Sequence, residues 1–386
     1  MGNKIYFDNA ASSWPKPEAV VEAMRDTVLN NGANPGRGSH YLAMEAGRKI
    51  FHSRQKCAQL YSIRNPNDLI FTNNTTLALN LAITGFLREN DHVICTSVEH
   101  NSVRRPLEWL RRTKNIEITY LESTPEGELD LKRVQSSFRR NTTLFVANHS
   151  SNLLGSIIPV EEIAQLTRRR KVKLLVDVAQ TAGVLQLRPL DTGIDMIAFP
   201  GHKGLYGPQG TGGLYISPEI DLEPLIYGGT GSQSDAIEQP SVRPDRYESG
   251  TLNTPGIAGL AAGVEYVLQE SVSKLYKHKW ELAQRLMDGL AKVEGLKLLG
   301  PPIGYPRTGI VSFQASWIDC SELAFILDHH FQIAVRAGYH CTPLAHITAG
   351  TIEAGAVRAS FSNFNTSEEV DCFVDAIKQV RITYNS

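Results

Sequence analysis

The sequence predicts an α/β protein with a mostly parallel sheet in a large domain, followed by a smaller α+β domain. Helical and strand-like segments alternate from about residue 17 to residue 216. Several of the strands are β-branched and largely apolar, as in LLVDV and MIAF. Strands that are buried on both faces have this composition, and helices then cover both faces of the sheet.

The elements of the large domain follow one another in short alternation. Helices are expected at residues 17–30, 41–61, 75–88, 101–113 and 159–170. Strands are expected at residues 68–72, 91–95, 143–147, 173–177, 194–199 and 212–216. The helix at 159–170 has the clearest ends. Glu161 and Glu162 lie in its first turn and the basic run RRRK closes it, an order that complements the helix dipole.

The pattern changes near residue 217. Residues 217–256 are polar and rich in Gly, Pro and Ser, which predicts a long loop, and loops of this length are usually functional or disordered. A helix with one apolar face follows, carrying Ile257, Leu260, Ala261, Val264, Val267 and Leu268. Short strands and two helices are expected in 295–386. We therefore predict a large domain at 16–256 and a small domain made of 1–15 and 257–386.

Composition and charge narrow the class of protein. The 386 residues are 42% hydrophobic and 20% charged, and the formal net charge is −1, so no long-range field attracts nucleic acid or a membrane surface. We see neither a signal-peptide core nor an apolar run of the roughly 20 residues that a membrane span needs. The five cysteines are scattered and form no C-x-x-C pair, so we expect no disulfide framework, no metal site and a cytoplasmic location.

Polar residues follow most of the predicted strands. The segments NNTT, TSVEHNS and NHSSNLLG come directly after the strands at 68–72, 91–95 and 143–147. The strand at 173–177 ends in Asp177, with Gln180 close behind, and the strand at 194–199 leads to His202 and Lys203. In a doubly wound sheet, ligands bind beyond the carboxyl ends of the strands, so these side chains are expected to converge on one site.

Several nucleotide and hydrolase motifs are excluded by their missing residues. Lys203 lacks the glycines and the following hydroxyl of a phosphate-binding P-loop, and the stretch GGTGSQS lacks the last glycine of a dinucleotide fingerprint. There is neither H-E-x-x-H nor G-x-S-x-G. The remaining chemistry is a Schiff base on Lys203, because burial favours the neutral, nucleophilic amine. Pyridoxal phosphate would also need a phosphate cradle, a carboxylate and a flat contact over its ring.

Each of these residues also has an ordinary structural explanation. Thr75 and Thr76 open a helix, where free N–H groups can hold a phosphate but where a threonine can also be a simple cap. Asp177 can be a plain capping or turn residue. The functional interpretation depends on the convergence of all these groups at one edge of the sheet.

Five segments of the chain resemble a known family. YFDNAA, TSVEHNS, SSNLLG, DVAQ and GHKGLYGPQGTGGL resemble the class V aminotransferases of pyridoxal-phosphate fold type I, and more narrowly the cysteine desulfurases and selenocysteine lyases. The resemblance covers residue 5 to about residue 380. It implies that Lys203 forms the Schiff base with the cofactor and moves a proton. Asp177 would pair with the pyridine nitrogen and Gln180 would hydrogen-bond the ring hydroxyl. His100 would stack on the ring as a catalytic residue.

The resemblance also implies how the phosphate and the substrate are bound. Thr75, Thr76 and His202 would hold the phosphate, and Asn152 would lie near the ring hydroxyl and the substrate carboxylate. Thr251, in ESGTLN, matches a threonine that reaches the phosphate of the neighbouring subunit, which implies a homodimer. The chain departs from the family at Pro200, where a phosphate-binding serine is expected. Proline supplies neither the hydroxyl nor the backbone N–H, so the threonines would have to make more of the hydrogen bonds to the phosphate.

The C-terminal part carries the motif that implies specificity. VRAGYHCTP resembles the R-x-G-x-x-C motif of the second desulfurase group, so Cys341 would be the catalytic cysteine and Arg336 would order its loop. Arg358 would bind the substrate carboxylate with its two-pronged guanidinium group. The other cysteines, Cys57, Cys95, Cys320 and Cys372, are interpreted as packing or surface residues.

The function implied by these residues is a pyridoxal-phosphate-dependent cysteine desulfurase. It would convert L-cysteine to L-alanine and leave the sulfur on Cys341 as a persulfide, with a sulfur-acceptor protein as a possible partner. The alternative is a selenocysteine lyase on the same scaffold. A transaminase or lyase for another amino acid, and a binding or regulatory protein that has lost its chemistry, are further alternatives.

Overall fold

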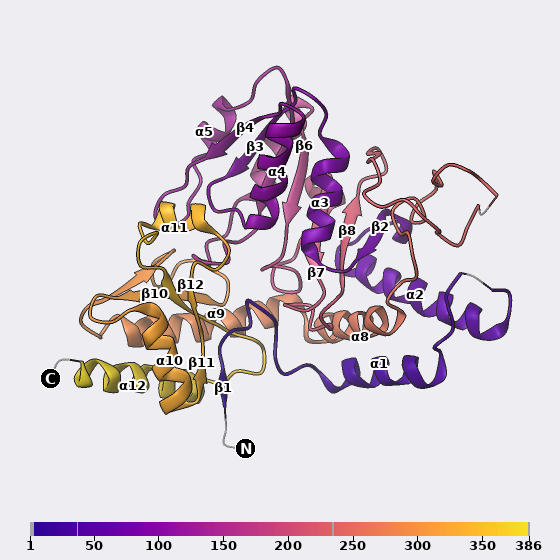
Figure 1. Ribbon diagram of the computed structural model, residues 1–386. Coiled ribbons are helices and arrows are strands. Elements are labelled where there is room, and N and C mark those ends of the chain that lie inside the picture. The colour runs from indigo at the N-terminus through magenta and orange to yellow at the C-terminus, as the bar shows by residue number, and fades with distance from the viewer. Residues whose placement is uncertain (1–3, 37, 234, 385–386) are drawn as a thin grey trace.

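A seven-stranded sheet forms the centre of the large unit. The structure is a computed structural model that describes residues 4–36, 38–233 and 235–384 (Figure 1). The strand order is β2(Leu69–Thr72), β8(Gly212–Ile216), β7(Met196–Pro200), β6(Lys173–Asp177), β5(Thr142–Asn148), β3(His92–Thr96) and β4(Glu117–Leu121). Every adjacent pair from β7 to β4 is parallel. Strand β8 is antiparallel to both of its neighbours, β2 and β7, so it runs in the opposite direction to the other strands of this sheet. The predicted mostly parallel sheet is confirmed.

Successive residues of the central strands are buried on opposite faces of the sheet. In β6, Leu174 and Val176 belong to one apolar cluster and Leu175 to another, and β5 and β7 alternate in the same way. One cluster packs under α3(Thr75–Phe86) and α4(Asn101–Thr113). The other packs against α2(Tyr41–Leu60), α6(Val160–Arg170) and α8(Thr254–Glu270). Burial on both faces explains why these strands lack a polar alternation in the sequence.

A second sheet forms the C-terminal unit, which lies at lower left in Figure 1. Its order is β12(Arg336–Gly338), β13(Ala356–Ser360), β10(Ile310–Ala315) and β9(Leu296–Leu299), with all pairs antiparallel. The helices α9(Val272–Leu290), α10(Cys320–Phe331) and α12(Ser367–Thr383) share a separate apolar cluster with this sheet. The N-terminal β1(Ile5–Tyr6) pairs with β11(Ile333–Ala334), which brings the first residues of the chain to the C-terminal unit.

Some elements were not predicted, and their sequences explain why. The edge strand β4 is partly exposed and reads EITYL, so it has no continuous apolar run. The short helices α5(Leu131–Ser136), α7(Pro189–Thr192) and α11(Pro343–Ala349) span too few residues to show a helical period. A short 3-10 turn, Pro66–Asp68, precedes β2. The described residues between β8 and α8 form no helix or strand, as expected for the long loop.

The division between the domains stays a prediction. The helix α8 begins the proposed small domain, yet it lies beside α1(Glu18–Asn30) and α2 and its Leu260 and Val264 join the core of the large sheet (Figure 1). Only from α9 onward do most buried side chains belong to the C-terminal cluster. Within the described part of the chain, no helix is both long enough and apolar enough to cross a membrane.

The helix α9 carries a buried lysine. Lys279 is 4% exposed, and its Nζ lies 5.2 Å from the centroid of the Tyr206 ring. No ion pair to Lys279 occurs among the residues that the structure describes. Burial lowers the pKa of Lys279 to about 8. Near neutral pH Lys279 is therefore still mostly charged. Its ammonium group has lost its water of hydration, and no carboxylate among the described residues compensates that loss.

We predict that Lys279→Met stabilises the protein. The folded-state pKa lies below the usual 10.5, so the buried charge costs most below pH 8, and this cost disappears as pH rises from about 8 toward 10.5. The variant should raise the free energy of unfolding by about 1–3 kcal/mol near pH 7, and less near pH 10. Urea denaturation at both pH values measures this. Lys277→Met, at an exposed site on the same helix, is the control; a loss of stability in Lys279→Met would contradict the account.

Candidate active site

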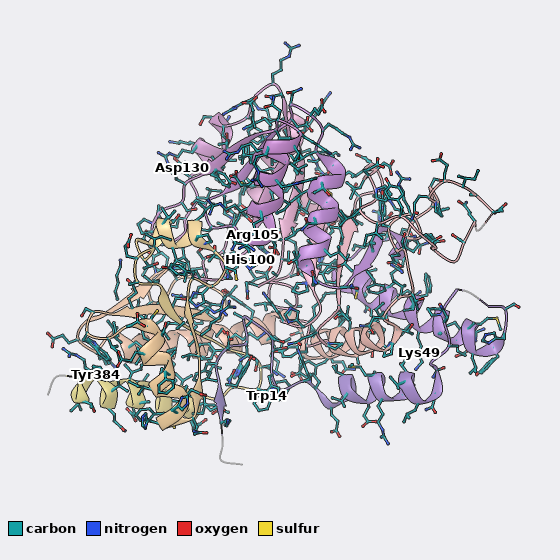
Figure 2. All side chains as sticks on the ribbon, viewed as in Figure 1. Trp14, Lys49, His100, Arg105, Asp130 and Tyr384 are labelled. Atoms are coloured by element: carbon teal, nitrogen blue, oxygen red, sulfur yellow. The ribbon has the colours of Figure 1, made fainter. Side chains whose placement is uncertain are left out.

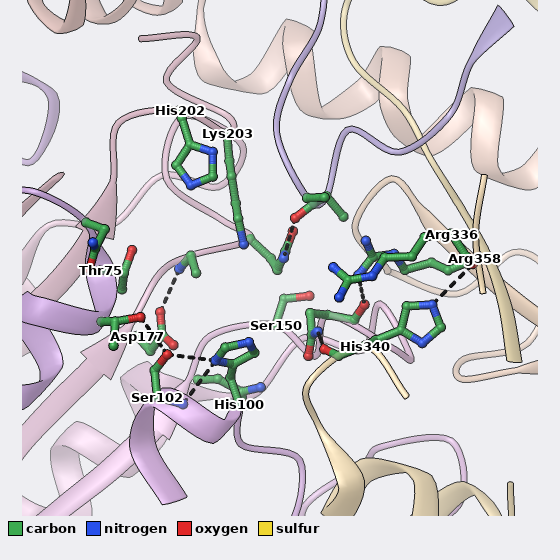
Figure 3. A pocket seen from close by; sticks show the side chains of 18 residues that line it. Thr75, His100, Ser102, Ser150, Asp177, His202, Lys203, Arg336, His340 and Arg358 are labelled. Carbon is green, nitrogen blue, oxygen red and sulfur yellow. Dashed lines mark hydrogen bonds between the residues drawn. The ribbon is translucent and has the colours of Figure 1, made fainter. Parts of the chain in front are cut away.

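A cavity of about 240 Å³ lies at the carboxyl ends of the parallel strands, where the C-terminal unit meets the large sheet. Figure 3 shows the side chains that line it. Ten of the predicted site residues are among them: Thr75, Thr76, His100, Asn152, Asp177, Gln180, His202, Lys203, Arg336 and Arg358. The convergence expected from the strand ends therefore exists. The two predicted residues outside the lining are Cys341 and Thr251.

Lys203 points into the cavity between the side that carries Asp177 and the side that carries the two arginines (Figure 3). The pKa of Lys203 is lowered to about 8, mainly by burial; the positive charges of Arg358 and Arg336 act in the same direction, whereas Asp177 and Asp8 act against it. The amine is thus much closer to its neutral, nucleophilic state than an exposed lysine.

The glycines around Lys203 let the backbone pass close to its neighbours. A Cβ atom on Gly204 would lie 2.2 Å from the carbonyl oxygen of Ala182. A Cβ atom on Gly201 would lie 2.0 Å from the hydroxyl of Thr211. The Gly-rich segment therefore holds Lys203 in a tightly packed turn that any side chain at these two positions would disturb.

Asp177 closes the end of β6 and faces the same cavity. The residue is 4% exposed, and its Oδ1 accepts a hydrogen bond of 2.8 Å from the backbone N–H of Ala179. Burial raises the pKa of Asp177 to about 6, while the Ala179 N–H and the charge of Lys203 act in the opposite direction. A cationic partner in the cavity would favour the carboxylate form.

His100 is fixed by the first turn of α4 and by a hydroxyl pair. Its Nδ1 accepts from the backbone N–H of Ser102 at 3.1 Å and lies 2.9 Å from the Ser102 hydroxyl. That hydroxyl is 2.8 Å from the hydroxyl of Thr76. Burial and the nearby cations lower the pKa of His100 to about 4, so the ring is neutral. Because a backbone N–H can only donate, Nδ1 is the acceptor and the ring proton lies on Nε2.

A group of donors near the start of α3 is suited to an anion. The Asn74 side chain caps the helix, accepting from Leu77 N–H at 2.9 Å, and Thr75 and Thr76 occupy its first turn. Thr75 Oγ1 and His202 Nδ1 are buried and have no hydrogen-bond partner among the described residues. Pro200 is the buried last residue of β7 and supplies no N–H, so the hydroxyls must provide more of the contacts.

The substrate side of the cavity holds two arginines. Arg358, on β13, is 1% exposed; its Nη1 donates to the carbonyl oxygen of Asn152 at 3.0 Å and its Nη2 to Asp8 at 2.8 Å. The Asn152 side chain donates to the carbonyl oxygen of His340 at 2.7 Å, and its own Oδ1 has no partner among the described residues. Gln180 donates to the carbonyl oxygen of Ala10 at 3.1 Å.

Cys341 lies at the edge of the site and is exposed. Its Sγ is 3.7 Å from Nη2 of Arg336, and its carbonyl oxygen accepts from the backbone N–H of Asn101 at 2.9 Å. His340 and Cys341 both have positive φ, 51° and 58°, so the loop turns sharply here. The thiol is therefore next to the predicted Arg336 but outside the group of residues that line the cavity.

Thr251 lies in a different cavity, of about 490 Å³, with Leu225, Ile226 and Asn253. Its hydroxyl accepts a hydrogen bond of 3.2 Å from Asn34. Thr251 therefore does not line the cavity that holds Lys203, and its role toward a neighbouring subunit stays a prediction.

The sequence did not single out several residues of the site. Ser102, Asn148, Ser150 and His340 line the cavity, and Asp8 pairs with Arg358. Ser102, Asn148 and Ser150 were inside the quoted strand-end segments, and His340 was inside the cysteine motif, so a systematic search of those segments would have found them. Asp8 was harder to find, because its one sequence signal was that it is the acidic residue of the YFDNAA segment.

The residues of the cavity fit pyridoxal phosphate. A lysine with a lowered pKa, a buried carboxylate, a neutral histidine and unpartnered buried donors near a helix start match what its aldehyde, ring and phosphate require. The large, mostly parallel sheet with the site at its carboxyl edge is that of fold type I. The fold and the site together define a pyridoxal-phosphate-dependent enzyme of this fold type.

Comparison with known proteins then gives the family. The model of the family described as Aminotransferase class-V matches residues 5–373. The chain belongs to this family.

Its relatives carry a narrower name. A probable cysteine desulfurase from Methanothermobacter thermautotrophicus is 34% identical over 97% of this chain and 94% of its own length. The cysteine desulfurase of Haloferax volcanii is 32% identical over 98% of this chain and 89% of its own length.

Solved structures agree with this assignment. The apo cysteine desulfurase of Thermococcus onnurineus has a TM-score of 0.93 and 33% identity, covering 98% of this chain and 95% of its own. The S-sulfonic acid form of the cysteine desulfurase CsdA from Escherichia coli has a TM-score of 0.87 and 25% identity, covering 97% of this chain and 94% of its own.

A buried carboxyl supports the position of His100. Glu99 is 1% exposed, and its Oε1 accepts from the Thr96 hydroxyl at 2.6 Å and from Asn148 N–H at 2.8 Å. Its backbone oxygen accepts from the Thr342 hydroxyl at 3.0 Å, which links the histidine segment to the cysteine loop. Burial raises the pKa of Glu99 to about 8, so the carboxyl is protonated near neutral pH.

We predict that Glu99→Gln is tolerated and Glu99→Ala is not. At pH 5 glutamine keeps the acceptor and the neutral state, so stability there should change by less than about 1 kcal/mol, whereas alanine leaves two donors unpaired and should cost about 2–4 kcal/mol. The pKa of Glu99 in the folded protein lies above the usual 4.5, so the stability of the wild type falls as pH rises from about 4.5 to 8. Glutamine does not ionise, so the stability of Glu99→Gln relative to wild type should increase over this pH range. Thermal midpoints at pH 5 and pH 8 measure both effects. Glu122→Gln, at an exposed site, is the control. Equal damage from both Glu99 variants would contradict a neutral carboxyl.

Proposed function

We propose that this protein is a cysteine desulfurase that uses pyridoxal phosphate to convert L-cysteine to L-alanine and transfers the sulfur to Cys341. The observation that carries the proposal is the position of an exposed thiol beside Arg336, at the edge of a cavity that unites Lys203, Asp177 and Arg358. The names of the relatives support it, because cysteine desulfurases span nearly the whole chain.

The cofactor's binding groups are assigned by their chemistry. Thr75, Thr76 and His202 are suited to the phosphate, Asp177 to the ring nitrogen and Lys203 to the aldehyde carbon. His100 presents a neutral ring to the same space. When bound, pyridoxal phosphate supplies an electron sink that weakens the bonds at the substrate's α- and β-carbons. Asp177 maintains this sink, since a carboxylate favours a protonated ring nitrogen.

The chain's own residues orient the substrate and move its proton. Arg358 and Asn152 would receive the α-carboxylate, and a guanidinium group suits this because it can bind both oxygens. Lys203 Nζ takes the proton from the α-carbon, and a pKa of about 8 allows it to accept and return a proton near neutral pH.

Cys341 then receives the sulfur. Its thiolate forms an S–S bond with the substrate sulfur while the Cβ–S bond of the substrate breaks. The electron pair of that bond remains on the carbon, which gains a proton, so the products are L-alanine and a persulfide on Cys341. Arg336 Nη2 donates a hydrogen bond to this sulfur at 3.7 Å, which holds the side chain on the cavity side of the loop. The loop that holds Cys341 must bring the sulfur inward, because the residue is outside the cavity lining.

The assembly and the location belong to the same proposal. A homodimer in which Thr251 reaches the partner's phosphate is supported by the exposed apolar Leu225 and Ile226 beside it. The persulfide on an exposed Cys341 is suited to delivery to a sulfur-acceptor protein. A cytoplasmic location is supported by five cysteines that are all free thiols.

We predict that Cys341→Ala abolishes persulfide formation and reduces alanine release from L-cysteine by at least about 10²-fold, because the substrate sulfur loses its acceptor. Cofactor content should not change, since Cys341 is outside the cavity. Alanine released from L-cysteine and from L-selenocysteine is measured side by side, with dithiothreitol present to remove the persulfide.

Cys372→Ala, which removes another exposed thiol, is the matched control and should behave as wild type. Full turnover of L-cysteine by Cys341→Ala would contradict the mechanism. Alanine from L-selenocysteine alone would replace the proposal with a selenocysteine lyase.

A further inference from the structure

The acid in the YFDNAA segment contacts Arg358, the residue proposed to bind the substrate's carboxylate. Asp8 Oδ1 lies 2.8 Å from Arg358 Nη2, and no other side chain among the described residues pairs with this carboxylate. The side chain of Arg358, which lines the cavity, is 1% exposed and that of Asp8 is 22% exposed, so this is a largely buried ion pair rather than a solvated surface contact. Such pairs are not weakened by solvent as surface pairs are.

The donors of Arg358 are unequally used. Nη1 donates to Asn152, Nη2 donates to Asp8, and the buried Nε has no partner among the described residues. A carboxylate gripped by two parallel bonds uses either Nη1 with Nη2 or Nε with Nη2. Both arrangements include Nη2, which is the nitrogen that Asp8 contacts. A two-bond contact with a substrate carboxylate therefore meets Asp8 as a competitor.

Several hydrogen bonds hold the backbone of Asp8, whereas Arg358 is the one partner of its carboxylate among the described residues. Asp8 forms a bridge with Ser360 of β13, and its carbonyl oxygen accepts from Tyr6 and from Ala11 N–H. Phe7 accepts from Ser360 N–H on one side of it, and Ala10 N–H donates to the Ser360 hydroxyl on the other. The carboxylate can therefore leave Arg358 by rotation about its side-chain bonds, without any movement of the strand.

The charges around the cavity also make Asp8 important when no substrate is bound. Arg336 and Lys203 face the same space as Arg358. The two arginines lower the pKa of Lys203, and the negative charge of Asp8 acts against them. Arg336 has no carboxylate partner among the described residues. Asp8 thus supplies a negative charge at the point where the substrate's carboxylate is expected.

We propose that Asp8 is a specificity-determining residue that occupies Arg358 in the free enzyme as an internal stand-in for the substrate's α-carboxylate and is displaced when an amino acid binds. It holds the guanidinium group in place and compensates its charge, and it sets the affinity that a ligand carboxylate must exceed. The prediction about KM rests on the proposed function, whereas the prediction about amino-acid binding requires only the cofactor-loaded site.

The test compares wild type with Asp8→Asn in the cofactor-loaded protein. L-alanine and ethylamine, which is L-alanine without the carboxylate, are titrated while the cofactor's visible absorbance reports binding. The apparent Kd of L-alanine should fall by about 3- to 10-fold in Asp8→Asn, because its carboxylate no longer competes with a resident charge. The Kd of ethylamine should stay within about 2-fold of wild type. The KM for L-cysteine should fall by a factor similar to that of L-alanine.

Two further variants keep the test decisive. Asp375→Asn removes one negative charge from an exposed position on α12 and should leave both Kd values unchanged. Asp8→Ala, whose cofactor content and thermal midpoint show whether it is folded, should change the L-alanine affinity in the same direction as Asp8→Asn. Weaker binding of L-alanine by the Asp8 variants would mean that Asp8 only positions Arg358, and an unchanged Kd would mean that it does not compete; either result overturns the proposal.

Discussion

Three cationic side chains share one cavity, and the chemistry of the site depends on how few carboxylates lie beside them. Lys203, Arg336 and Arg358 line this cavity together with one carboxylate, Asp177, and a second carboxylate, Asp8, reaches the site only through its ion pair with Arg358. Burial and the neighbouring guanidinium groups lower the pKa of Lys203 to about 8. An amine in this state attacks a carbonyl carbon and exchanges protons near neutral pH. Arg336 has no carboxylate partner among the described residues, and its charge favours a ligand that carries a carboxylate.

The fold creates this arrangement by joining two sheets at the site. The parallel strands place Asp177, His100 and Lys203 at one edge, because the carboxyl ends of parallel strands meet there. The C-terminal sheet contributes Arg336 and Arg358 from paired positions of β12 and β13. The N-terminal segment pairs with the C-terminal unit and delivers Asp8. Residues from the beginning, the middle and the end of the chain thus meet in one cavity.

The sequence was informative where burial or a motif imposes a pattern. The strands around Leu175 and Ile197 were predictable because both faces are buried, and Lys203, Asp177 and Arg358 were predictable from motifs. The partly exposed strand β4 lacked such a pattern. The pairing of Asp8 with Arg358 spans 350 positions, and the exposure of Cys341 depends on a loop conformation, so neither follows from local sequence. The protonated state of Glu99 likewise depends on burial that only the packed structure defines.

The most direct test of the account is to identify the lysine that binds the cofactor. The protein is incubated with pyridoxal phosphate near pH 7.5, reduced with borohydride and digested, and the modified peptide is located by mass spectrometry. We expect a single modified lysine, Lys203, even though burial also lowers the pKa of Lys279 and Lys16 to about 8, because among the described residues Lys203 is the lysine that lines the cavity beside Asp177. An unmodified Lys203 with label on either of the other two would contradict the central assignment.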